Sequence, residues 1–247
     1  MDNEGGSIRC HRCPFSKMMQ ERAFMTPQYN PLYEEPAYGV PEAAAYLKVP
    51  YQTLRYWLTG FNARPPVVEP VEKSPIRLSF LNLLECQVLA GMRKIYKVKL
   101  PRVRSALIQV AQDYPQPHPL VSQVFLTDRK NLFIEKVGKI INVSEHGQMD
   151  LNFYEMHLER IKMDPDGMLK FFPFVVHPGL GEPKSVEINP MIGFGKPVIA
   201  GTGISTAIIA SRFNARDSIA DLAAEYDCSP QQIEEAIRWE LPLPVAA

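Results

Sequence analysis

Apolar residues recur with a helical period between Tyr38 and Leu58, and this segment gives the strongest structural signal in the chain. Six of them fall on two successive helical faces: Val40, Ala44, Leu47, Leu54, Trp57 and Leu58. Pro50 suits the first turn of the second helix, where a missing N–H costs no hydrogen bond. The small Ala44 allows two helices to cross closely. The pattern predicts two short helices joined by a tight turn, with Val49 buried between them.

The segments after Leu58 predict smaller elements. Repeated prolines exclude a helix from Pro65 to Ile76, so a short hairpin or an extended arm is expected there. Helices are expected over about Ser79–Tyr96 and Pro101–Asp113. Short alternating runs and one further helix predict a mixed middle region, with elements at Val124–Leu126, Leu132–Glu135, Ile140–Val143, Leu151–Arg160 and Phe171–Val176. The turn Asp164–Gly167 separates two of these, and Pro178–Lys184 has the composition of a linker.

Three helices are predicted near the C-terminus, over Thr206–Phe213, Ser218–Tyr226 and Ser229–Trp239. Serine is a favoured residue at helix N-termini, which supports the last two starts. Glycines at 201 and 203 precede the first helix. They fit a tight turn better than a phosphate-binding loop, because Pro197 follows Lys196 where such a loop requires Ser or Thr.

The second N-terminal helix presents hydrogen-bonding side chains away from its apolar face: Tyr51, Gln52, Thr53, Arg55 and Tyr56. Such side chains suit phosphates and base edges. The whole chain has no net charge, but residues 36–114 carry eleven Lys or Arg against five Asp or Glu, a net of +6. This distribution favours binding to double-stranded DNA. An ordinary helical hairpin with a polar face is the alternative, and a solvated helix end explains Arg93–Lys99 nearly as well.

The segment Tyr38–Trp57 resembles the winged helix-turn-helix of mercury-resistance (MerR-like) regulators. The matching residues are Ala44, Val49, Thr53, Leu54, Arg55, Tyr56 and Trp57, while Lys48 takes the place of the family's turn glycine. The resemblance implies that the Pro-rich stretch up to Arg77 is the wing. The candidate DNA contacts are then Lys48, Tyr51, Gln52, Thr53, Arg55, Tyr56, Lys73 and Arg77.

The C-terminal module resembles a small family of domains from proposed bacterial antitoxins. Gly195-Lys196-Pro197, Ile199, Gly201-Thr202 and Ile204 match its motif, and Gly203 stands where that family usually has Arg. The order of the chain from Tyr38 to Trp239 resembles the larger VapB-type antitoxins of toxin–antitoxin operons. This resemblance implies repression of the protein's own operon and neutralisation of a PIN-domain ribonuclease toxin.

An α+β fold with four segments is therefore expected: a flexible leader (1–36), a winged helix-turn-helix domain (37–116), a mixed α/β middle region with a linker (117–184) and a three-helix module (185–247). From Asn189 onward the chain has four Lys or Arg residues and seven Asp or Glu residues, a net charge of −3. This charge favours contact with a protein over contact with DNA. A merely structural cap is the alternative. We accordingly expect residues 186–247 to be dispensable for DNA binding.

Arg212, Phe213 and Arg216 are the candidate partner-binding residues. The two arginines, expected one turn apart on the same side of a helix, would reach acidic groups of the toxin. Solvated helix-end charges are the equally weighted alternative. A homodimer on a two-fold-symmetric operator is expected, because one helix-turn-helix covers little DNA. Leu81, Leu84, Val88 and Met92 would form either the dimer interface or the core.

Other chemistries find little support in the sequence. Cys10 and Cys13 have the spacing of half a zinc site, but no second Cys or His pair lies near them, so neither a metal nor a cofactor is expected. The signatures His-Glu-x-x-His and Gly-x-Ser-x-Gly are absent, and no catalytic residue is assigned. The scattered cysteines and the lack of a long apolar run predict a cytoplasmic protein. A one-component regulator that responds to a small ligand, and less so a hydrolase within 121–176, remain as alternatives.

Overall fold

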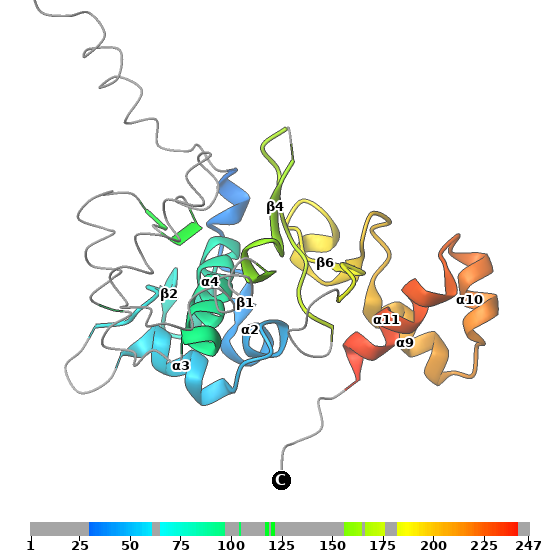
Figure 1. Ribbon diagram of the computed structural model, residues 1–247, viewed down its shortest axis with the longest axis horizontal. Coiled ribbons are helices and arrows are strands. Elements are labelled where there is room, and N and C mark those ends of the chain that lie inside the picture. Colours follow the sequence, from blue (N-terminus) through cyan, green and yellow to red (C-terminus); the bar gives the residue numbers. More distant parts are fainter. Residues whose placement is uncertain are drawn as a thin grey trace, which may run out of the picture.

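The computed structural model describes residues 30–60, 65–96, 104, 117–118, 120–121, 156–164, 166–175 and 182–241. Within them, helices accompany three small antiparallel sheets with the strand orders β1-β3-β2, β4-β5 and β6-β7. Figure 1 shows helices α2, α3 and α4 grouped in one half of the molecule and α9, α10 and α11 at the opposite end, with β4 and β6 between them. The expected mixture of helices and separate antiparallel strands, an α+β architecture, is therefore found.

The two predicted N-terminal helices are α2 (Val40–Tyr46) and α3 (Tyr51–Thr59). All six apolar residues that defined them are buried, while Val49 between them is half-buried against the same core. The turn is closed by hydrogen bonds from Lys48 N to Ala45 O (3.3 Å) and from Val49 N to Ala44 O (3.1 Å). The spacing of apolar residues thus predicted both helices, because each helix buries one face in the core.

A three-stranded sheet and a long helix complete this half. Strand β1 (Tyr38–Gly39) pairs with β3 (Ile76–Leu78), and β3 pairs with β2 (Glu72–Lys73), so a hairpin forms at the end of the Pro-rich segment. Helix α4 (Phe80–Tyr96) follows, one residue after its predicted start. Leu81, Leu84 and Val88 are fully buried in the chain's own core, so for these three residues the core alternative is confirmed and the dimer-interface alternative is not.

The middle of the chain adds a hairpin to the same core. Met156–Leu158 are helical, and β4 (Ile161–Met163) pairs with β5 (Leu169–Phe171) around the predicted turn, where Gly167 N donates to Asp164 O at 2.9 Å. The strand expected over Phe171–Val176 is misplaced. It ends at Phe171, because Pro173 has no N–H for a strand ladder. The other predicted middle elements and the helix over Pro101–Asp113 lie outside the described residues.

The expected flexible leader (1–36) includes residues at its C-terminal end that are part of the fold. The turn η2 (Pro31–Tyr33) places Tyr33 in the main core with 1% of its surface exposed. Its hydroxyl accepts a hydrogen bond from Leu169 N at 3.0 Å. Sequence periodicity could not reveal this anchor, because a single aromatic residue in a Pro-rich stretch shows no period.

The C-terminal module begins with β6 (Val186–Glu187), the turn η3 (Gly193–Gly195) and β7 (Val198–Ile199). Helices α9 (Thr206–Asn214), α10 (Ile219–Glu225) and α11 (Pro230–Glu240) follow within two residues of their predicted bounds. Ser218 and Ser229 cap the last two helices through hydrogen bonds to the backbone N–H of Asp221 and Gln232. The tight turn before α9 is present, with positive φ at both Gly201 and Gly203.

The three helices have a small apolar core of their own, but the module is not detached from the rest: Ile188 lies in the main core, and Trp239 shares a third cluster with Val175, Val186 and Tyr46. Arg160 ties down the end of the supposed linker by donating to the carbonyls of Glu182 (2.7 Å) and Pro183 (3.0 Å). The terminal module therefore packs on the N-terminal half, while the expectation that residues 186–247 are dispensable for DNA binding stays a prediction.

Candidate nucleic-acid interface

Helix α3 presents a polar face to the surface. Leu54, Trp57 and Leu58 hold its inner side, each with no more than 2% of its surface exposed. Tyr51, Gln52 and Arg55 are exposed on the other side, whereas Thr53 and Tyr56 are half-buried. Because the inner face is fixed in the core, the outer side chains keep a defined spacing, which recognition of a rigid duplex requires.

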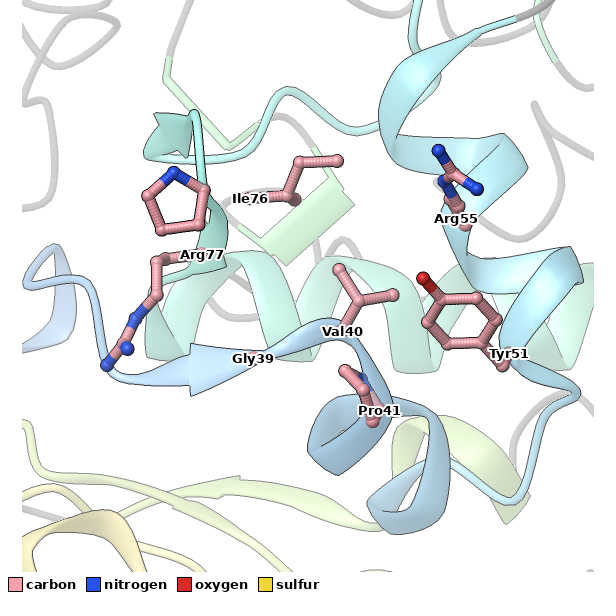
Figure 2. A pocket seen from close by; sticks show the side chains of 8 residues that line it. Gly39, Val40, Pro41, Tyr51, Arg55, Ile76 and Arg77 are labelled. Carbon is pink, nitrogen blue, oxygen red and sulfur yellow. The ribbon is translucent and has the colours of Figure 1, made fainter.

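A hollow of about 460 Å³ lies between α3 and the β2–β3 hairpin. Its lining comes from three segments: Gly39, Val40, Pro41, Tyr51, Arg55, Pro75, Ile76 and Arg77. Figure 2 shows Tyr51 and Arg55 on the side formed by α3, and Ile76 and Arg77 on the side formed by the hairpin. Each wall contributes an arginine to the lining, and Figure 2 shows the guanidinium of Arg77 directed away from Arg55, toward the segment before β1. Arg55 supplies a positive group suited to a phosphate oxygen on the α3 side.

The two basic side chains of the hairpin, Arg77 and Lys73, make weak interactions within the protein. Arg77 Nη2 donates to Ala37 O at 3.3 Å, which uses one of its five N–H donors. Lys73 pairs with Glu69 at 2.6 Å, and both side chains are about 70% exposed. Such an exposed ion pair contributes at most about 1 kcal/mol, so Lys73 can exchange Glu69 for a phosphate at small cost.

Lys48 lies apart from the other candidate DNA contacts. Its Nζ sits 4.3 Å from the ring centroid of Trp239 in α11, and burial lowers the pKa of Lys48, against the opposing charges of Glu182 and Glu240. Its φ of 50° lies in the left-handed region that favours glycine.

The candidate partner-binding residues differ in their availability. Arg212 is occupied by Asp217 (2.6 Å) and Glu225, and its guanidinium also donates to the Tyr226 hydroxyl. Arg216 lies beyond the end of α9 with φ 81°, so the idea that the two arginines share one helical face is wrong. Phe213 is 39% exposed on α9.

Sequence reasoning missed the most exposed aromatic residue of the described chain, Phe194. It is 94% exposed, with φ 55° and ψ 34°, and the flanking Gly193 and Gly195 also have positive φ. Non-glycine residues in this conformation are strained and often serve function. The Gly-Phe-Gly triplet was the signal, because two glycines around an aromatic residue let a short turn present the ring to solvent.

Several other kinds of site were searched for in the part of the chain that the structure describes. No group of three or more His, Cys, Asp or Glu is placed there to hold a metal ion, and Cys10 and Cys13 fall outside it. None of the described helices is long and apolar enough to cross a membrane. Burial raises the pKa of the Cys86 thiol, and Glu85 adds to the effect, so this thiol is not an activated nucleophile.

Comparison with known proteins gives a match to a family model over residues 186–239, that of DUF433, a family described as of unknown function. Two proteins of Mycobacterium tuberculosis are similar over most of their length. One, named "Putative antitoxin VapB45", is 27% identical over 83% of this chain and 94% of its own. The other, the uncharacterised protein Rv2308, is 23% identical over 84% of this chain and 91% of its own.

The crystal structure of Rv2018 from Mycobacterium tuberculosis has a similar fold. Its TM-score to this chain is 0.62 at 24% identity, over 82% of this chain and 98% of that one. The likeness extends well beyond the 54 residues of the family match, so the N-terminal half and the terminal module belong to one shared architecture.

Proposed function

We propose that this protein is an antitoxin-type repressor. In this proposal α2 and α3 form a helix-turn-helix, the β2–β3 hairpin is its wing, and the unit binds double-stranded operator DNA of its own operon. The observation that carries the proposal is the hollow between α3 and the hairpin, whose lining includes Arg55 on one side and Arg77 on the other. A phosphate of the DNA backbone would lie between these walls while Tyr51, Gln52 and Arg55 reach the major groove.

The antitoxin part of the proposal rests on the similarity to the protein named as an antitoxin. The partner would be a PIN-domain ribonuclease, and the acidic terminal module would meet basic surface around its RNA-binding site. Phe213 and Phe194 offer exposed aromatic anchors, the residue type that most often dominates protein interfaces. Arg212 contributes little to such contacts while it remains in its ion pairs with Asp217 and Glu225.

A homodimer on paired half-sites remains part of the proposal, because a single unit of this size covers too little DNA for tight specific binding. Its interface does not involve the inner face of α4, whose leucines are buried. Light scattering of the protein with and without a duplex would show a dimer on DNA, and a monomer in both samples would exclude it.

The DNA proposal is tested with a labelled duplex from the region upstream of the gene. Arg55→Ala should weaken binding by about 1–3 kcal/mol, roughly 5- to 150-fold. Arg77→Ala should weaken all duplexes alike and lower the slope of log K against log salt by about one. Lys162→Ala is the matched control, because it removes the same charge from β4, outside the hollow. If Arg55→Ala and Arg77→Ala both bind as the wild type and the control do, the interface lies elsewhere.

The toxin proposal needs a separate test. The PIN-domain ribonuclease encoded beside the gene would be co-expressed with the full chain and assayed for RNA cleavage. Inhibition should weaken in Phe213→Ser, while DNA binding stays unchanged. An uninhibited ribonuclease, or one whose inhibition responds to Arg55→Ala and not to Phe213→Ser, would contradict the division of roles.

A further inference from the structure

Lys48 occupies a position where a turn of this kind normally has glycine. Its left-handed φ of 50° is unfavourable for a residue with a Cβ, at a cost of about 1–2 kcal/mol. The backbone bonds around it, from Lys48 N to Ala45 O and from Val49 N to Ala44 O, would form equally well with glycine. These backbone bonds therefore do not distinguish lysine from glycine, and the difference between the two residues lies in the lysine side chain.

That side chain reaches the last helix of the terminal module. Lys48 Nζ lies 4.3 Å from the centroid of the Trp239 ring, close to the face of the best of the aromatic cation acceptors. Both residues are largely shielded from water, since Trp239 is 6% exposed and Lys48 is half-buried. A cation–π contact strengthens when it is desolvated, and burial lowers the pKa of Lys48 as expected in such surroundings.

Trp239 also packs on α2 itself. Its ring lies 5.7 Å from the ring of Tyr46, whose hydroxyl donates to Glu42 at 2.8 Å. The same Glu42 carboxylate pairs with Lys196 at 2.5 Å, and the Tyr38 hydroxyl donates to Gly195 O at 3.1 Å. The terminal module thus touches the start of α2, its last turn and the turn that follows.

The turn held by Trp239 leads directly into the helix with the proposed DNA face. Only Val49 and Pro50 separate Lys48 from Tyr51, the first residue of α3. A rotation at Lys48 would swing Tyr51, Gln52 and Arg55 relative to the hairpin that carries Arg77. Displacements of this kind weaken recognition because the contacts of both walls must be made together.

We propose that Trp239 is a positioning residue for DNA binding: α11 holds the Lys48 turn and thereby sets the orientation of α3. The inference rests on the proposed function, since it explains how the terminal module supports the DNA face without touching DNA. It replaces the expectation that this module is dispensable for DNA binding.

Three variants at Lys48 test the contact. Lys48→Gly keeps the turn and removes the side chain, Lys48→Met keeps its length without charge, and Lys48→Arg keeps a cation. Affinity for the duplex should fall about 5- to 30-fold in Lys48→Gly and Lys48→Met and stay within about twofold of wild type in Lys48→Arg. Trp239→Leu should lower the affinity for the duplex by the same factor. Adding Lys48→Gly to Trp239→Leu should cause no further loss of affinity. Lys162→Met is the control for the loss of a charge.

A direct contact of Lys48 with phosphate would give a different pattern. It would lower the salt slope by about one in Lys48→Gly and leave Trp239→Leu with wild-type affinity. Positioning predicts an unchanged slope and an equal loss in both variants. Wild-type affinity in Trp239→Leu, or additive losses in the double variant, would overturn the inference.

A second measurement separates this inference from the proposed function. The chain has two tryptophans, and Trp57 is 1% exposed in the core. Quenching of fluorescence by acrylamide should therefore increase in Lys48→Gly, as Trp239 loosens, whether or not DNA is present. If Arg55→Ala has no effect on DNA binding while the quenching changes as expected, the proposed function fails and the Lys48–Trp239 contact stands. Unchanged quenching would refute the contact.

Discussion

Substitution of Gly195 by alanine probes the seat of the terminal module on the N-terminal half. Gly195 has φ 73°, and a Cβ added to it would overlap the hydroxyl of Tyr38, which donates to Gly195 O at 3.1 Å. Gly201 in the neighbouring turn has φ 79°, and nothing lies within 4 Å of its Cβ position. The two alanine variants therefore share the backbone strain and differ in the clash.

The expected costs follow from these two surroundings. A left-handed alanine costs about 1–2 kcal/mol, so Gly201→Ala should lower the free energy of unfolding by about that amount. Overpacking against buried groups adds about 1–3 kcal/mol, so Gly195→Ala should cost about 2–5 kcal/mol. Urea denaturation followed by far-ultraviolet circular dichroism measures both values on the full chain.

Tyr38→Phe provides the matched rescue. It removes the clashing hydroxyl, and the next nearest atom, the ring Cζ, lies 3.4 Å from the Cβ position, an ordinary contact distance. The single change loses a buried hydrogen bond worth about 1 kcal/mol. In the Tyr38→Phe background, Gly195→Ala should then cost no more than Gly201→Ala. Equal costs of the two glycine variants in the wild-type background would refute the packing argument.

Three further outcomes are expected. Burial alone would lower the pKa of His118, but its hydrogen bonds to Glu85 and Glu34 and their charges raise the pKa to about 9. Its stabilisation is therefore complete below about pH 6.5 and lost as the pH rises through 9, and His118→Gln should flatten this alkaline fall in the urea midpoint. A chain ending at Pro183 should lose its cooperative thermal transition, because the partners of Tyr38 and Tyr46 are removed; a native-like melt would contradict this. Leu84→Ala should cost about 2–5 kcal/mol in urea and leave the oligomeric state in light scattering unchanged.

Local signals in the sequence predicted the helices well. The apolar period located α2, α3 and α4, and serine caps located α10 and α11 to within two residues. These features depend on neighbours within one or two helical turns, which a sequence displays directly. The outer face of α3 followed from the same period, because side chains opposite a buried stripe must face away from the core.

Contacts between segments that are distant in the sequence could not be predicted from the sequence. The sequence placed Tyr33 in the leader and Trp239 at the end of a predicted helix, with no role in packing, yet each belongs to a core cluster with distant segments. The left-handed Lys48 could not be explained from its neighbours, because its partner lies in α11. The hollow likewise joins residues from three segments, and only the folded chain places Arg55 and Arg77 in one lining, with β3 held beside β1.

The hydrogen bond between Tyr38 and Gly195 spans 157 positions, and it bears on how the chain is made. During synthesis α2 leaves the ribosome long before Gly195 and Trp239 have been made. The face of α2 that carries Tyr46 therefore stays exposed to solvent until translation is nearly finished. Closing so long a loop is slow, and exposed apolar surface on a nascent chain attracts chaperones and other chains. The packing around α2 is therefore completed only when the C-terminal residues have been made, and an interrupted translation product would lack these contacts.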